Sequence, residues 1–178
     1  CVGKTDNNAE GIEYINFIFV KKLIEYINLN KFKLRLIHLS SVSIYGGPKN
    51  FFGTKKLISE NSTTLTYDNY SKSKLKADLI IQNVVKENLN KNFSFTILRI
   101  SNVFGGRQQS NLFKFVLFSL KSCIWVKSYE DIIFNFVNIK DVTQSVILII
   151  TKIKISKNKT YIVSDDCKQY ELYKKYQK

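Results

Sequence analysis

Apolar positions in the first half of the chain alternate between a helical period and short continuous runs. Apolar residues recur on a broad helical face over 12–27 and again over 70–88. Short apolar runs at 34–39 and 93–100 each predict a buried strand. In the second predicted helix, the residues expected to face the core are Leu75, Leu79, Ile80, Val84 and Val85.

The second half continues the alternation. Strands are predicted near 124–126, at 133–139 and at 161–163, and helices at about 111–121 and from about 170 to 176. Asp141 is expected to cap one more helix, whose inner face would be Val142, Val146, Ile149 and Ile150. An order in which helices and strands alternate predicts an α/β domain with a mostly parallel sheet.

Composition narrows the class of protein. With 178 residues, of which 44% are hydrophobic, the chain is long enough to fold as one globular domain. Basic residues outnumber acidic ones by 28 to 14, a net charge of +14 that raises the possibility of a polyanionic partner. The excess is nearly all lysine, is spread along the chain, and accompanies heavy Asn and Ile usage. General lysine enrichment is therefore favoured over a nucleic-acid-binding patch.

Cysteine usage and apolar run length bear on location. Cys1, Cys123 and Cys167 lack the close spacing of a zinc site or a disulfide framework, which predicts a reducing, cytoplasmic environment. The longest apolar runs, such as 15–20 and 146–150, are well short of the roughly 20 residues that span a bilayer, so no membrane partner is expected. Methionine is absent even at position 1, which suggests that the sequence is a fragment.

Candidate chemistry lies where strands end, because ligands of open parallel sheets bind at the carboxyl ends of the strands. A serine-rich turn at 40–46 follows the strand at 34–39, and Tyr70 opens the next helix. Tyr70 and Lys74 are four residues apart and share a helix face, where an ammonium is expected to lower the pKa of the phenol. Ser41 could hydrogen-bond the same substrate oxygen. By itself this spacing also arises by chance in a chain rich in Tyr and Lys.

Several segments, in order, resemble the extended short-chain dehydrogenase/reductase family of nucleotide-sugar epimerases, dehydratases and reductases. The family's Ser-Ser-x-x-Val-Tyr-Gly turn and Tyr-x-x-x-Lys motif correspond to 40–46 and 70–74, with Glu60 in the place of the intervening Glu. Further matches are Asn16-Phe17 with Leu23-Ile24, Leu98 to Gly105, Phe136 to Val142, and Tyr161 to Ser164. The resemblance covers nearly the whole chain.

The resemblance implies a role for each matching residue. Tyr70 would be the catalytic acid/base, Lys74 would lower its pKa and bind the nicotinamide ribose, and Ser41 would orient the substrate hydroxyl. The implied cofactor, NAD or NADP, would also contact Tyr70, Ser40, Asn16 and Ser101. The implied substrate contacts are Ser41, Ser43 and Asn102, and no metal is implied.

Departures from the family pattern bear on the reaction, which would be hydride transfer to or from a nucleotide sugar. Family dehydratases carry Asp-Glu where this chain has Val42-Ser43, so an epimerase or keto-reductase is favoured. Phe134 replaces an Arg that UDP-sugar epimerases often carry, and the Gly-x-Gly turn of the family is absent from 127–131. The expected pathway is sugar-nucleotide or surface-polysaccharide biosynthesis.

The resemblance implies one Rossmann-like, doubly wound domain over 1–178 that is truncated at its N-terminus. About 1–105 and 136–165 would form the core, and about 106–135 and 166–178 would form part of a small substrate lobe. Without the family's N-terminal glycine-rich turn, the fragment is expected to bind cofactor weakly and not to turn over. Gly3-Lys4-Thr5 does not replace that turn, because no glycine precedes it at P-loop spacing. The helices at 12–27 and 70–88 would form a homodimer interface.

Two other functions remain as alternatives. A non-catalytic binding module of the same fold would have no need for Ser41, Tyr70 and Lys74 together. A lysine-rich nucleic-acid-binding protein would show steeply salt-dependent binding to DNA or RNA.

Overall fold

The computed structural model describes residues 9–47, 57–105, 114, 117–119, 121–122, 133–168 and 171. The chain divides into two compact units. The first comprises Cys1–Arg99 and Ile149–Ile162, and the second comprises Ile100–Leu148 and Val163–Lys178. The predicted boundaries between core and substrate lobe stay a prediction.

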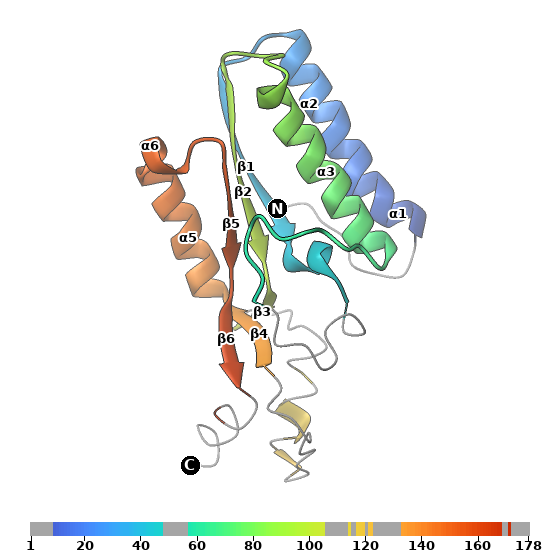
Figure 1. Ribbon diagram of the computed structural model, residues 1–178, viewed down its shortest axis with the longest axis vertical. Coiled ribbons are helices and arrows are strands. Elements are labelled where there is room, and N and C mark those ends of the chain that lie inside the picture. The colour runs from blue at the N-terminus through green and yellow to red at the C-terminus, as the bar shows by residue number, and fades with distance from the viewer. Residues whose placement is uncertain are drawn as a thin grey trace. The chain divides into compact units, whose positions relative to one another are not determined.

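A parallel sheet organises the first unit. Its strands β1 (Leu34–Ser41), β2 (Phe93–Ile100) and β5 (Lys159–Val163) are arranged in the order β1-β2-β5. Their arrows point the same way in Figure 1. Each strand coincides with a predicted apolar run, which confirms the α/β class and the parallel sheet. Long crossover connections join these strands, as parallel pairing requires.

Three consecutive helical segments replace the single helix predicted over 12–27. They are α1 (Ala9–Glu13), a π-helical segment (Tyr14–Ile18) and α2 (Phe19–Leu29). Helix α3 (Asn69–Lys86) packs beside them and against β1. Figure 1 shows these helices together on one face of the sheet. The core between them consists of Ile24, Ile27, Ile81, Val84, Phe93, Phe95 and Ile97.

The inner face of α3 differs in part from the predicted one. Val84 is buried as predicted, and Leu75, Ile80 and Val85 are half-buried. Leu79 is 48% exposed, so its prediction as a core residue is wrong. The buried positions of the helix include Lys74, Ala77, Asp78, Ile81 and Val84, and a residue directly after Asp78 is rotated away from that face.

Both ends of α3 have recognisable caps. At the N-terminus, Asp68 accepts a hydrogen bond from Ser71 N at 2.7 Å, and the Ser71 hydroxyl accepts one from Asp68 N at 3.1 Å. This capping box determines where the helix begins and puts Tyr70 in its first turn. At the C-terminus, Asn88 adopts a left-handed φ of 54° and Leu89 N bonds back to Val84 O at 3.0 Å.

A small mixed sheet organises the second unit. Strand β3 (Asn102–Phe104) pairs in parallel with β4 (Ile133–Asn138), and β4 pairs antiparallel with β6 (Asp165–Lys168). Strand β4 confirms the strand predicted at 133–139 and ends one residue earlier. Neither β3 nor β6 was predicted, because both are short and lack an apolar run.

Helix α5 (Ile139–Thr151) begins earlier than its sequence suggested. Asp141 lies in the first turn, so its predicted role as the cap is wrong; Asn138 instead accepts a hydrogen bond from Lys140 N at 2.9 Å. Val142 and Ile149 are buried as predicted and Val146 is half-buried, whereas Ile150 is 55% exposed. The short helix α6 (Ile153–Ser156) follows.

Some predictions fall on residues outside the described ranges. These are most of the helix at 111–121, the strand at 124–126, nearly all of the helix at 170–176, and the segments around Cys1 and Cys123. Within the part of the chain that the structure describes, no helix has the length and apolar character needed to cross a membrane. The same residues contain no group of three or more His, Cys, Asp or Glu side chains suited to a metal ion.

Candidate functional site

The serine-rich turn at the end of β1 is held by its own side chains. Ser41 Oγ accepts a hydrogen bond from Ser43 N at 3.2 Å, which caps the 3₁₀ turn Val42–Tyr45. Gly46 follows with a φ of 138° that favours glycine. At Gly47, a Cβ atom would lie 2.8 Å from the ring of Tyr67, so only glycine fits without a shift. Local sterics therefore determine the path of the chain directly after Ser41.

Ser41, Tyr70 and Lys74 come together where β1 ends and α3 begins. The Tyr70 phenol lies near the Ser41 side chain, whose polar influence acts to lower the pKa of the phenol. Lys74 is 7% exposed, and its ammonium donates to Leu39 O at 3.1 Å and lies 5.8 Å from the centre of the Tyr70 ring. The structure thus brings the three predicted catalytic side chains into one place.

Burial, not Lys74, sets the direction of the Tyr70 pKa. Burial raises the pKa of Tyr70, and the Ser41 side chain acts to lower it. The negative charges of Asp68 and of an ionised Tyr67 raise it further, so the pKa of Tyr70 is above its ordinary value. Lys74 is not among the causes of this shift, and the lowering of the Tyr70 pKa predicted for it stays a prediction. The ammonium lies at the ring and bonds the Leu39 carbonyl. Tyr70 is consequently a neutral phenol at pH 7, in the form that donates a proton.

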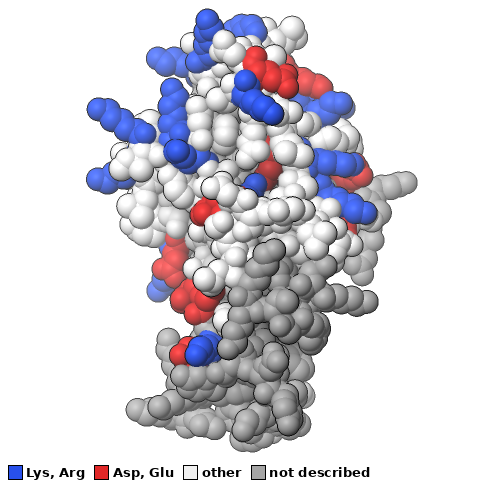
Figure 2. Space-filling model, in the orientation of Figure 1, with Lys and Arg blue, Asp and Glu red and all other residues white. Residues whose placement is uncertain are grey.

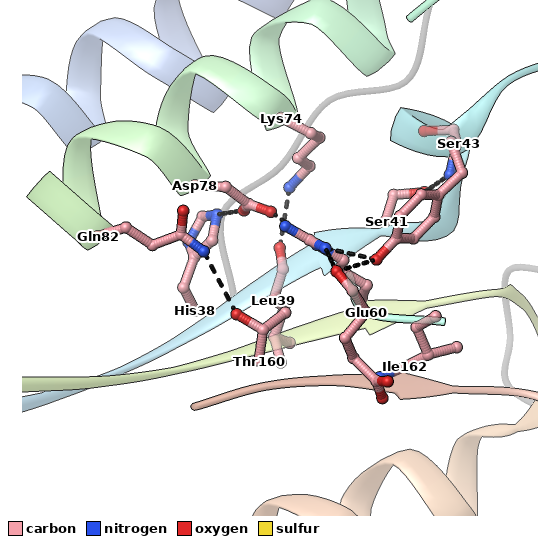
Figure 3. A network of polar contacts seen from close by, with 12 residues as sticks. His38, Leu39, Ser41, Ser43, Glu60, Lys74, Asp78, Gln82, Thr160 and Ile162 are labelled. Atoms are coloured by element: carbon pink, nitrogen blue, oxygen red, sulfur yellow. Dashed lines mark hydrogen bonds and ion pairs between the residues drawn. The ribbon is translucent and has the colours of Figure 1, made fainter. Parts of the chain in front are cut away.

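A buried ionic network lies beside this group (Figure 3). Asp78 is fully buried and accepts a hydrogen bond from Arg99 Nε at 3.1 Å, while His38 Nε2 lies 3.6 Å from its other oxygen. Burial raises the pKa of Asp78, opposed by Arg99, the Ser40 side chain and Lys74. Ser40, predicted to contact the cofactor, is therefore next to the Asp78 carboxylate.

Sequence reasoning missed the members of this network. Asp78 follows Lys74 by one helical turn on a buried face, and Arg99 interrupts an otherwise apolar strand. Charged side chains are almost never buried without a partner of opposite charge. The acidic Asp78 and the basic Arg99, both at positions expected to be buried, could therefore have been recognised as a pair. His38, the one histidine of the chain, likewise interrupts the apolar residues of a strand, β1.

Glu60 connects the segment 57–67 to the sheet. Its backbone oxygen accepts hydrogen bonds from Arg99 Nη1 at 3.0 Å and from the Tyr45 hydroxyl at 3.1 Å, and Arg99 also donates to that hydroxyl. Its carboxylate accepts from Ile162 N, on β5, at 2.9 Å. The residue noted in the sequence for its position between the two motifs therefore anchors the chain that joins them.

Asn16 is 2% exposed and lies in the π-helical segment that packs against α3. A π-helical turn inside a helix is uncommon and frequent at functional sites. At the surface, an ion pair of 2.6 Å joins Glu13, the last residue of α1, to Lys76 on α3. The sequence predicted Asn16 as a cofactor contact, and that role stays a prediction.

Ser101 and Asn102 belong to the second unit. Ser101 N donates to Val163 O at 3.1 Å, and Asn102 Nδ2 donates to Asn135 O at 3.2 Å. The Ser101 hydroxyl is buried and has no hydrogen-bond partner among the described residues. Their predicted contacts, with cofactor for Ser101 and with substrate for Asn102, stay predictions.

The donor set in the first unit fits a polyhydroxylated ligand and a nicotinamide ribose. Lys74 has one of its three ammonium protons on Leu39 O, which leaves two for other acceptors. The Ser43 hydroxyl is buried, and within the described residues it has no hydrogen-bond partner. Together with the phenol of Tyr70 and the hydroxyl of Ser41, these groups can bind vicinal hydroxyls and exchange a proton with one of them.

A comparison with protein families gives a match that covers most of the chain. The sequence model of the NAD dependent epimerase/dehydratase family matches residues 1–164. Among curated proteins, no significant match is found.

Comparison with solved structures shows the same fold. The chain is 17% identical to UDP-glucuronic acid 4-epimerase from Bacillus cereus in complex with NAD, with a TM-score of 0.74 over 99% of this chain and 58% of that one. It is 18% identical to the UDP-Glc/GlcNAc 4-epimerase of Campylobacter jejuni, with a TM-score of 0.75 over 98% of this chain and 58% of that one. It is 16% identical to dTDP-glucose 4,6-dehydratase from Bacillus anthracis in complex with NAD, with a TM-score of 0.70 over 96% of this chain and 54% of that one. The chain spans little more than half the length of these structures.

Proposed function

Because the chain belongs to the NAD-dependent epimerase/dehydratase family, we propose that it acts in the epimerisation or keto-reduction of a nucleotide sugar, with NAD or NADP as cofactor. The observation that carries this proposal is the meeting of Ser41, Tyr70 and Lys74 at the carboxyl end of β1. Neither a non-catalytic module nor a nucleic-acid-binding protein is favoured by the comparisons.

Each of the three residues has a distinct task in this proposal. Tyr70 moves the proton of the reacting sugar oxygen. As a neutral phenol it donates that proton to the carbonyl oxygen of a keto sugar, and as a phenolate it accepts the proton of the hydroxyl that is oxidised first in an epimerisation. Ser41, which lies near the Tyr70 phenol, holds the same oxygen in place. Lys74 would hold the ribose of the cofactor through the ammonium protons that Leu39 O does not use. A bound nicotinamide cofactor supplies the redox chemistry, by accepting or returning a hydride.

The remaining predicted contacts are part of the same proposal. Ser40, Asn16 and Ser101 would contact the cofactor, and Ser43 and Asn102 the substrate. The buried hydroxyls of Ser43 and Ser101, without partners among the described residues, support a ligand at each.

The turn after Ser41 favours epimerisation or reduction over dehydration. Water elimination needs an acid and a base beyond the tyrosine, and the 3₁₀ turn Val42–Tyr45 carries no carboxylate. We place the reaction in sugar-nucleotide or surface-polysaccharide biosynthesis in the cytoplasm.

We also propose a homodimer formed through the helices at 12–27 and 70–88. Its support is the apolar surface that these helices expose, which includes Tyr14 at 58%, Phe19 at 48%, Tyr26 at 59% and Leu79 at 48%.

Replacing Tyr70 tests the proposed reaction. The enzyme, expressed from its complete natural reading frame, is offered UDP- and dTDP-sugars with and without NADPH. Tyr70→Phe is expected to lose about 10²–10⁴-fold in kcat while its affinity for cofactor is retained. Net consumption of NADPH identifies a keto-reductase and excludes simple epimerisation. Near-normal turnover by the variant would show that the acid/base assignment is wrong.

A further inference from the structure

One face of α3 carries three ionisable side chains in a row. Tyr70, Lys74 and Asp78 follow one another at intervals of four residues, so they point to the same side of the helix. Lys74 is 7% exposed and Asp78 is fully buried. Bulk water therefore stabilises neither charge, and each needs hydrogen bonds and an opposite charge within the protein.

The Asp78 carboxylate is fixed from the neighbouring strands. Arg99 Nε, on β2, donates to one of its oxygens at 3.1 Å. The other oxygen faces His38 Nε2, on β1, at 3.6 Å. Figure 3 shows Asp78 and Lys74 next to each other on α3, with His38 facing the carboxylate and Leu39 O below the ammonium. The carboxylate thus has a defined position one turn from Lys74.

Among the described residues of this buried group, Asp78 is the acidic side chain that faces the positive charges of Lys74 and Arg99. The ionisable side chains from the elements around Lys74 are Tyr70 and Asp78 on α3, His38 on β1, Arg99 on β2, Tyr45 in the 3₁₀ turn, and Glu60. His38 is neutral, because burial and the charge of Lys74 lower its pKa to about 3. The Glu60 carboxylate is exposed and bonds Ile162 N. Asp78 is therefore the counter-charge that the buried network provides for Lys74 and Arg99.

We infer that Asp78 is a positioning residue, whose carboxylate keeps the Lys74 ammonium charged and held at Leu39 O beside Tyr70. This inference rests on the proposed function, in which Lys74 binds the ribose of the cofactor next to Tyr70. Asp78 acts through Lys74 and contacts neither substrate nor cofactor. In agreement, burial lowers the pKa of Lys74 and the charge of Asp78 raises it.

The ionisation of Lys74 in the chain itself tests the inference. An NMR titration follows the Cε and Nζ shifts of each lysine against pH, and Lys74→Arg identifies the Lys74 signal. In Asp78→Asn, the midpoint for Lys74 is expected to fall by about one pH unit, the lower end of the effect of a nearby opposite charge. In Asp78→Glu, which keeps the carboxylate, the Lys74 midpoint is expected to return most of the way to its original value. An unchanged midpoint in Asp78→Asn would overturn the inference.

The chain contains a matched control for this comparison. Lys21 and Glu25 have the same four-residue spacing and lie 3.8 Å apart, but their side chains are 49% and 61% exposed. Glu25→Gln is the control variant for helix spacing alone, because water screens an exposed pair. An effect of Glu25→Gln on Lys21 as large as that of Asp78→Asn on Lys74 would mean that helix spacing, and not the buried network, causes it.

Two further measurements apply if Asp78→Asn does not fold because Arg99 is left unpaired. The double variant Asp78→Asn/Arg99→Gln removes both charges, and Lys74 is expected to titrate at lower pH there too. In the unsubstituted chain, the Cγ shift of Asp78 at pH 7 must be that of a carboxylate. A protonated Asp78 at pH 7 would overturn the inference without any variant.

An activity measurement separates this inference from the proposed function. In the enzyme from the complete reading frame, Asp78→Asn is expected to move the alkaline limb of the kcat profile to lower pH, since Lys74 then loses its proton earlier. Asp78→Glu is expected to keep the original limb. If no nucleotide sugar is converted, the proposed function fails, while the NMR titration still decides whether Asp78 is the counter-charge of Lys74.

Discussion

His38 makes the stability of the fold depend on pH in a way that can be calculated. Its imidazole is buried between β1 and α3, and burial together with the charge of Lys74 lowers its pKa from 6.5 to about 3. In the unfolded chain the imidazole is exposed to water and returns to its ordinary pKa. Between these two values the unfolded chain binds one proton more than the folded chain, so stability decreases as the pH falls.

The size of the effect at pH 5 follows from these values. At pH 5 the imidazole of the folded chain is still neutral. The imidazole of the unfolded chain is protonated, because pH 5 is one and a half units below its ordinary pKa of 6.5. Each unit corresponds to about 1.4 kcal/mol, so His38 reduces the free energy of unfolding by about 2 kcal/mol between pH 7 and pH 5. The figure changes little if the folded pKa is 4, because that group is also neutral at pH 5. Above pH 6.5 the imidazole is neutral in both states, so this loss of stability is absent.

Urea unfolding of the chain and of His38→Gln at pH 7, 6 and 5 measures this contribution. Gln keeps a donor near Asp78 but does not titrate, so other groups cancel in the comparison. The unsubstituted chain is expected to lose about 2 kcal/mol more than the variant over this range. Since the chain has a single histidine, its Hε1 resonance needs no assignment and is expected not to titrate above pH 5. A native titration near pH 6.5, or equal losses in both proteins, would refute the reasoning.

Two further predictions concern the segments that flank Tyr70. Glu60→Ala removes the acceptor of Ile162 N and is expected to lower the free energy of unfolding by about 1 kcal/mol or less, measured by urea titration; Glu60→Gln keeps an acceptor oxygen and serves as control. Asp68→Ala removes the cap of α3 and is expected to cost about 1 kcal/mol. Asp68→Ser, which can still cap, should lose less than half of that, and equal losses would contradict the capping role.

The strands of the parallel sheet and the spacing of Tyr70 and Lys74 could be predicted because they are local features of the sequence. The strands at 34–39 and 93–100 show as apolar runs, and Tyr70 and Lys74 share a helix face by spacing alone. The exposure of Leu79 and Ile150 could not be predicted in this way. A helical face inferred from the sequence is more than one residue wide, and only packing in the folded chain decides which edge of that face is buried.

The direction of the Tyr70 pKa required the three-dimensional structure for a different reason. Spacing places a lysine beside the phenol, but it does not say whether the ammonium faces the oxygen or the ring. In the structure the ammonium bonds Leu39 O, on a strand that is remote in sequence from α3. Asp78, Arg99 and His38 likewise come from three elements, and no local pattern joins them.

Arg99 shows why the stability of this unit and the geometry of its site are coupled. Its guanidinium donates to Asp78 on α3, to the Tyr45 hydroxyl in the turn after Ser41, and to the backbone oxygen of Glu60. These three segments carry Lys74, Ser41 and the chain that leads into Tyr70. Five donors in one rigid plane can join three segments that an apolar side chain could only pack against. A substitution at Arg99 would therefore move Ser41, Tyr70 and Lys74 relative to one another as well as weaken the fold.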